Sequence, residues 1–182
     1  MAPRHLIAPL LLAALAAAPL AQAQSAGNAS LVAPKQLIVD PSLPKGTARA
    51  NVLAARRYDT FWNNGDEALA KAALSPQFVD RTPPPGRVQG PDGPLQASKA
   101  FRQAVPDLTC EVEQMLVVGD RVVSHLHFAG HFTGSFNGIQ GKGQAIDFIA
   151  TDIYRVAEGK IVENWHLEDN LTLLKQLGVI KD

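Results

Sequence analysis

The sequence predicts an α+β domain in which helices cover one face of a curved, mainly antiparallel sheet. Helical periodicity is confined to the first half of the chain, whereas runs rich in Val, Ile, Phe and Tyr fill the second half, from residue 109 onward. The turns Gly119-Asp120 and Glu158-Gly159 each separate two of these runs. Connections of this length cannot carry a parallel crossover, so the flanking runs should pair as antiparallel hairpins. A chain of 182 residues has room for one ordinary domain.

The N-terminus has the pattern of a secretory signal peptide. Arg4 and His5 precede an apolar run over residues 6–20, and the small residues of Ala21-Gln22-Ala23 follow it. The run is too short to span a bilayer comfortably, which disfavours a membrane anchor. We therefore expect residues 1–23 to be removed and the mature protein to be periplasmic or secreted.

An extended leader arm is expected over residues 24–47, because this stretch is rich in Ala, Ser and Pro and has no sustained period. The domain itself should comprise residues 48–182. Its first helix is predicted by apolar residues at three- and four-residue steps from Val52 to Trp62, and Gly65 is suited to end it.

Two shorter helices should follow. Asp66 is a suitable N-cap for the second helix, which should stop at Ser75-Pro76. Pro94 can begin a third helix in its first turn, with an end near Pro106. Four strands are then expected over residues 109–118, 121–129, 145–156 and 160–167, and a short amphipathic segment from Asn170 closes the chain.

Charge and cysteine content exclude several classes of function. The 17 Lys and Arg residues balance the 17 Asp and Glu residues, and no basic run stands out. Such a chain lacks the electrostatic footprint for nucleic acid or an anionic membrane, so we expect a small or neutral partner. The single thiol, Cys110, excludes an intramolecular disulfide and a cysteine-rich metal site.

Three histidines share one parity of the second predicted strand: His125, His127 and His131. Strict alternation turns the apolar residues of the other parity toward the helices and these histidines outward. A bulge near Gly130, in a glycine-rich stretch, would return His131 to the inner side. Histidines two residues apart on a strand can also bind one metal ion, which leaves a metal site as a weaker alternative.

Two carboxylates are candidate proton carriers. In the last predicted strand, Trp165 and Asp169 share the parity of Ile161, so alternation carries both inward. Desolvation raises the pKa of a buried carboxyl toward the range in which it exchanges protons at neutral pH. The alternative is that Asp169 merely caps the terminal helix. Asp80 precedes a proline-rich loop, where the alternative role is a local turn bond.

Several segments together resemble the SnoaL-like polyketide cyclases of the nuclear-transport-factor-2-like (NTF2-like) superfamily. The resemblance extends over about residues 48–178, and its motifs are residues 130–139, 152–155 and 158–165, Asp169 and residues 176–178. It implies a cone of three N-terminal helices against a strongly curved sheet, with a pocket between them. It also implies cofactor-free acid–base catalysis of an intramolecular aldol closure, and a homodimer through the open sheet face, where His125 and His127 would lie.

By position, the resemblance implies that Asp169 is the acid–base residue and that Trp165 is the pocket indole. Asp80 matches an acidic position that the family often places before a histidine, but Arg81 follows it here. Phe132 stands where the family commonly has an imidazole, and His131 is one place earlier. Residues 140–143 replace a turn that is usual at the pocket rim.

These inferences combine into a hypothesis for the site. A dry pocket is expected to accept a small, mostly apolar carbonyl compound, with Asp169 at its end as general base and a lining of Trp62, Leu126, Phe128, Phe132 and Trp165. His131 or Arg81 would donate to the developing enolate, giving cyclase, isomerase or dehydratase chemistry without a cofactor. Two alternatives remain open, a non-catalytic exported protein that holds an apolar ligand and a metalloprotein that uses the histidine cluster.

Overall fold

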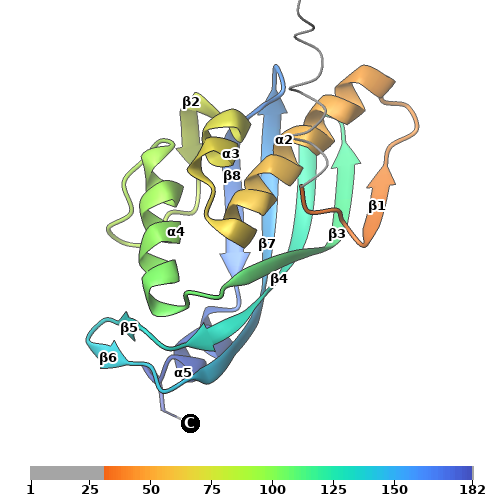
Figure 1. Cartoon of the computed structure of the whole chain (residues 1–182). Helices are drawn as coiled ribbons and strands as arrows, with labels where there is room; N and C mark the ends of the chain where they lie inside the picture. The colour runs from red at the N-terminus through yellow and green to blue at the C-terminus, as the bar shows by residue number, and fades with distance from the viewer. Residues whose placement is uncertain (1–30, 182) are drawn as a thin grey trace, which may run out of the picture. The chain divides into compact units, whose positions relative to one another are not determined.

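Six strands form one mixed sheet in the order β1-β3-β4-β7-β8-β2 in the computed structural model, which describes residues 31–181 (Figure 1). The predicted signal peptide lies outside the described residues. The sheet comprises β1 (Gln36–Val39), β2 (Leu74–Asp80), β3 (Thr109–Val118), β4 (Arg121–Phe132), β7 (Gln144–Ala157) and β8 (Lys160–Glu168). The four central strands pair antiparallel, whereas β1 pairs parallel with β3, and β2 pairs parallel with β8. The expectation of an α+β fold is confirmed.

Helices cover one face of this sheet (Figure 1). They are α2 (Lys45–Asn64), α3 (Glu67–Ala73) and α4 (Asp92–Ala104), and a short α5 (Asn170–Gln176) follows β8. The predicted ends are confirmed at two places. Gly65 ends α2 in the left-handed conformation, with φ 77°, and the Asp66 side chain caps α3 by accepting a hydrogen bond from the Ala68 N–H at 2.9 Å. A small hairpin of β5 (Ser135–Phe136) and β6 (Ile139–Gln140) lies outside the main sheet.

The two edge strands were not expected from the sequence. Strand β1 lies within the segment expected to be an extended arm, and β2 follows α3 directly. Pro76 lies in β2, where the register with β8 shifts between Leu74 and Val79. Proline is compatible with such an irregular edge strand because it has no N–H to donate to a neighbour.

An extra residue in β8 decides which side chains face the helices. Arg155 pairs with Glu163, whereas the next residue, Val156, pairs with Ile161, so Val162 is bulged out of the pairing with β7. A bulge of this kind reverses the alternation of all residues beyond it. By contrast, β4 and β7 pair continuously from Arg121 to Phe132.

The core lies between the helices and the covered face of the sheet. Its fully buried side chains include Phe61 of α2, Met115 of β3, Phe132 of β4 and Tyr154 of β7. None of the helices in the described part of the chain is both long and apolar enough to cross a membrane.

Candidate functional site

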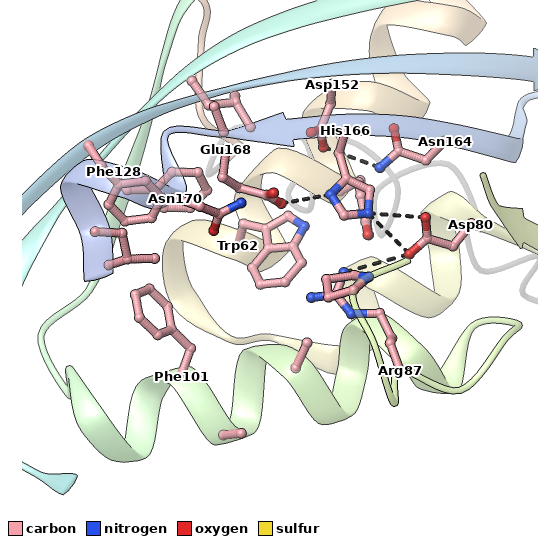
Figure 2. Close-up of a pocket in the computed structure, with 18 of the residues that line it drawn as sticks. Trp62, Asp80, Arg87, Phe101, Phe128, Asp152, Asn164, His166, Glu168 and Asn170 are labelled. Atoms are coloured by element: carbon pink, nitrogen blue, oxygen red, sulfur yellow. Dashed lines mark hydrogen bonds and ion pairs between the residues drawn. The ribbon is translucent and has the colours of Figure 1, made fainter. Parts of the chain in front are cut away.

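A cavity of about 300 Å³ lies between the helices and the sheet (Figure 2). Most of its wall is apolar, with aromatic contributions from Tyr58, Trp62, Phe101, Phe128, Phe136 and Phe148. The Phe128 and Phe148 rings stack with centroids 5.0 Å apart, and Trp62 meets Phe128 edge to face at 6.4 Å. Such a lining suits a planar, largely apolar ligand.

One wall of the cavity is polar, and His166 lies at its centre (Figure 2). Its Nδ1 lies 2.6 Å from Glu168 Oε1, and its Nε2 lies 3.0 Å and 3.1 Å from the two oxygens of Asp80. The side chains of His166 and Asp80 are only 5% and 4% exposed. Strands β8 and β2 are neighbours in the sheet, which brings Asp80 beside a histidine 86 positions later.

His166 is positively charged at neutral pH. Burial alone would lower the pKa of its ring, but the hydrogen bond and charge of Glu168, with the charges of Asp152 and Asp80, raise it to about 9. Both ring nitrogens therefore carry a proton, and each donates to a carboxylate. The hydrogen bond from the imidazolium in turn lowers the pKa of Glu168 against the opposing effect of burial.

The loop after β2 fixes the position of Asp80. Its carboxylate accepts a hydrogen bond from the Thr82 N–H at 3.0 Å, and Arg87 Nη1 lies 3.6 Å from it. The Gln89 side chain bonds both the N–H and the C=O of Asp80. Asp80 thus makes the local turn bond that was one of its two predicted roles. It also lines the cavity, which its other predicted role, that of a proton carrier, requires.

The predicted inward orientation of Trp165 and Asp169 is wrong. Asp169 is exposed and caps α5 by accepting hydrogen bonds from the Thr172 N–H at 3.1 Å and hydroxyl at 2.7 Å, which lower its pKa. Trp165 faces away from the cavity, with the Arg121 guanidinium 5.6 Å from its ring. The bulge at Val162 explains both placements because it turns the alternate set of β8 inward.

His131, Arg81 and Phe132 also lie outside the cavity lining. His131 is exposed and bonds Asp107 through its backbone N–H and its Nδ1, both at 2.7 Å, because β4 has no bulge at that position. Arg81 pairs with Glu163 and points away from the cavity. Phe132 is buried in the core. The predicted residues that do line the cavity are Trp62, Asp80, Leu126 and Phe128.

The histidines proposed as an alternative metal site do not converge. His125 Nδ1 lies 2.9 Å from Thr151 Oγ1, and His127 Nε2 lies 2.9 Å from Asp147. A different group with ligand spacing, formed by Glu111, Glu113 and His127, occurs in the described residues. The Lys35 ammonium already pairs with both of its glutamates, at 2.9 Å and 2.6 Å.

Sequence reasoning missed most of the polar wall. Asn164, His166 and Glu168 alternate along β8, and none of them was singled out because the prediction turned Trp165 and Asp169 inward without the bulge. The spacing of these three polar residues is the signal that could have revealed them. Asp152 and Arg87 come from β7 and a loop, and nothing in the local sequence marks them as cavity residues.

The chain has helices on one face of a mixed sheet and, between them, a largely apolar cavity with one charged wall. This architecture is the NTF2-like fold, with a cavity of a size for small molecules. The sequence profile of the family described as SnoaL-like polyketide cyclase matches residues 52–177. This chain therefore belongs to the SnoaL-like polyketide cyclase family.

Solved structures agree with that assignment. A "putative polyketide cyclase" from Bacillus cereus is 43% identical, with a TM-score of 0.76, and the match covers 84% of this chain and 96% of that one. IdmH, a "putative polyketide cyclase" from Streptomyces antibioticus, is 26% identical, with a TM-score of 0.63 and coverage of 70% and 98%. AclR from Streptomyces galilaeus, a "putative hydroxylase", is also 26% identical, with a TM-score of 0.65 and coverage of 74% and 84%. A search of curated proteins found no match.

Proposed function

We propose that the protein binds a small, mostly apolar carbonyl compound and catalyses cofactor-free proton transfer on it, as a cyclase, isomerase or dehydratase does. The observation that carries this proposal is the hydrogen-bonded chain from buried Asp80 through buried His166 to the partly exposed Glu168, in the wall of an otherwise largely apolar cavity. Buried, hydrogen-bonded ionisable groups in an apolar cavity are the arrangement that general acid–base chemistry requires.

Asp80 is the proposed general base. Its carboxylate removes a proton from the carbon next to the substrate carbonyl, and the electron pair of the broken C–H bond moves toward the carbonyl oxygen. The imidazolium of His166 and the guanidinium of Arg87, in the same wall, stabilise the negative charge that develops. A proton taken up by Asp80 exchanges with solvent or returns to the substrate, because both ring nitrogens of His166 already carry a proton and cannot accept it.

The probe for this proposal is 2-tetralone, an aromatic ketone with exchangeable α-protons. We expect it to bind the cavity and the protein to speed the incorporation of deuterium at its α-carbon in D₂O, followed by proton NMR. Asp80→Asn should slow the exchange by at least about 100-fold, the lower range for general-base catalysis. Arg81→Gln is the matched control, because the neighbouring Arg81 pairs with Glu163 away from the cavity.

Two results would overturn the proposal in different ways. Binding of 2-tetralone without exchange above the buffer rate would contradict catalysis and favour a protein that only holds its ligand. Failure of 2-tetralone to bind would contradict the assignment of an apolar carbonyl ligand. Slower hydrogen exchange of the backbone amides of Trp62 and Phe128 on binding would place the probe in the cavity.

A homodimer through the open sheet face is part of the same proposal. Four apolar side chains lie in one row across that face, where the strand register pairs Leu116 with Val123, Val123 with Ile153, and Ile153 with Trp165. Nearby, Ile149 and Leu167 are 47% and 75% exposed. Apolar side chains gathered in this way on a surface commonly mark a protein interface.

Light scattering after size exclusion tests the dimer. We expect the wild-type protein to have the mass of two chains and Ile153→Asp to have the mass of one. Leu37→Asp is the control, since Leu37 is also 47% exposed but lies on the edge strand β1. A monomeric wild-type protein would contradict the dimer.

Export is proposed from the sequence pattern of residues 1–23. Expression of the full chain in a bacterium should yield a periplasmic product whose mass corresponds to a start at Gln24. Recovery of the uncleaved chain in the cytoplasm would contradict export.

A further inference from the structure

A second set of buried acidic groups lies beside the polar wall and has no part in the reaction described above. Tyr154 and Asp152 are on β7, and Asp59 is on α2. The Tyr154 hydroxyl lies 2.7 Å from Asp59 Oδ1 and 2.9 Å from Asp152 Oδ2. Asp59 and Tyr154 are fully buried, whereas Asp152 is 5% exposed and lines the cavity.

The two short contacts of the Tyr154 hydroxyl call for a second proton among these three groups. A phenol has a single proton and can donate to only one of the two carboxyls. The second short contact is a hydrogen bond only if the other carboxyl is protonated and donates to the phenol oxygen. Two ionised carboxylates joined through one oxygen would also repel each other in a place without water.

The environment of the pair agrees with a bound proton. Burial raises the pKa of Asp59 to about 7, although hydrogen bonds from Tyr154 and Ser124 oppose the shift. Burial likewise raises the pKa of Asp152 to about 6, against the positive charge of His166. Other titratable groups that face the pair from the packed elements are Tyr58 on α2, Cys110 on β3, and His166 and Glu168 on β8.

An independent feature marks this wall as a place for a polar group of the ligand. Asn164 lines the cavity and is 3% exposed, and its Nδ2 lies 3.4 Å from Asp152 Oδ2. Its Oδ1 is buried and accepts no hydrogen bond from the described residues. A buried acceptor without a donor is costly, and a hydroxyl of a bound ligand would supply the missing proton.

We propose that Asp59, Tyr154 and Asp152 hold one shared proton behind the cavity wall and that Asp152 delivers it to the substrate oxygen. This step rests on the proposed function, because Asp80 must remove the carbon proton. As the C–H bond breaks, its electron pair forms the C=C bond, and the carbonyl π pair forms the new O–H bond with the proton of Asp152. The O–H electron pair of Asp152 stays on its carboxylate, and the resulting enol hydroxyl can donate to Asn164.

Asp152 is therefore a second catalytic residue, whereas Asp59 and Tyr154 are positioning residues that act through it. During the return step, the enol gives its proton back to Asp152. The proton held by Asp80 goes to carbon or, where carbon attacks a second carbonyl, to the oxygen of that carbonyl. The proton count of the enzyme is then restored without a cofactor.

Infrared spectroscopy of protein with carbon-13 in its aspartate carboxyls tests the shared proton without any substrate. We expect the wild-type protein to show the band of a buried, protonated carboxyl that persists to a higher pH than in Asp59→Asn or Asp152→Asn. In either variant the remaining carboxyl receives the whole Tyr154 hydrogen bond and should ionise at lower pH. Asp147→Asn, an exposed position on the same strand, should leave the band unchanged. Absence of the band in the wild type, or its survival unchanged in both variants, would overturn the shared proton.

Deuterium exchange into 2-tetralone tests the delivery step. Asp152→Asn should lower the rate by about 100-fold, as expected for the loss of a general acid. Asp59→Asn should lower kcat with KM unchanged and move the alkaline limb of the pH profile to lower pH, which a merely structural change would not do. Melting curves of both variants establish that they fold.

The outcomes separate this inference from the proposed function. If the wild type exchanges and Asp80→Asn does not, but Asp152→Asn behaves as the wild type, the delivery step is wrong and the proposed function stands. If the wild type does not exchange at all, the proposed function falls and the delivery step with it, while the infrared band still decides whether the proton is shared.

Discussion

The two faces of strand β8 carry side chains with opposite roles. On the inner face, Asn164, His166 and Glu168 line the cavity, and His166 bridges two carboxylates. On the outer face, Trp165 packs near Arg121 and Leu167 is exposed. A single bulged residue before these positions determines which set faces inward. The chemistry of the site therefore depends on strand register as much as on residue type.

The same comparison applies to two histidine–carboxylate pairs. His131 lies 2.7 Å from Asp107 with its side chain 60% exposed, whereas His166 is 5% exposed and bonds a carboxylate at each ring nitrogen. Exposed pairs contribute little to stability because water competes for both partners. Breaking a buried pair is costly because the remaining charge has no partner. Similar distances thus have different consequences.

Removing the bulge should have the largest effect on stability, because it exchanges the two faces of β8. Deletion of Val162 forces either Ile161 out of the core or His166 out of the cavity wall, because the strand must regain strict alternation. We expect the free energy of unfolding to fall by about 3 to 5 kcal/mol, the cost of losing a large core side chain or a buried ion pair. Urea titration measures the loss. A deletion variant as stable as the wild type would show that the register of β8 is not fixed.

Replacing His166 should destabilise the protein in a way that depends on pH. His166→Gln leaves two carboxylates without their shared cation, which should cost about 3 kcal/mol near neutral pH. The folded pKa of about 9 is above the unfolded value of 6.5, so the stabilisation by His166 is complete below pH 6.5 and is lost as the pH rises through 9.

The stability gap between wild type and His166→Gln should therefore narrow between pH 6.5 and 9. His131→Gln is the matched control, and its stability should follow that of the wild type throughout. A gap for His166→Gln that is constant over this range would contradict a raised pKa.

Loss of the α5 cap should have a smaller effect. Asp169→Ala removes the acceptor for the Thr172 N–H and hydroxyl, so the melting temperature should fall by about 2 to 4 °C. The rate of deuterium incorporation into 2-tetralone should stay at the wild-type value, because Asp169 lies outside the cavity. Calorimetry measures the first effect. An unchanged melting temperature would mean that the cap contributes nothing to stability.

The smallest effect is expected on the outer face of β8. Arg121→Gln removes the guanidinium 5.6 Å from the Trp165 ring, which should cost about 0.5 kcal/mol at this partly exposed position. Chemical denaturation followed by tryptophan fluorescence would detect it. A much larger loss would indicate that the outer face is buried in the assembled protein.

Local signals predicted the fold well where the structure depends on neighbours in the chain. The short hairpin turns, the Gly65 end of α2 and the Asp66 cap all have local causes, and all are confirmed. Strands β1 and β2 were not predicted, because their parallel partners lie far along the sequence and short edge strands carry little periodicity.

The site was predicted only in part, for a related reason. Leu126 and Phe128 were placed correctly because β4 alternates without interruption beside β7. On β8, one bulged residue reversed the prediction for Trp165 and Asp169, and only the alternating polar residues beyond it could have signalled the change. Asp59 was not singled out, since a single acidic residue in a helix reads as a surface residue until tertiary packing buries it.

The chemistry of this protein is proposed to lie on the inner face of β8 and not at its outer end. The most direct test compares deuterium incorporation into 2-tetralone by His166→Gln and Asp169→Asn with that of the wild type, at equal occupancy of the cavity. We predict that His166→Gln lowers the rate by at least about 100-fold and that Asp169→Asn retains the wild-type rate. Loss of exchange in Asp169→Asn with full activity in His166→Gln would place the chemistry at the outer end of β8 instead.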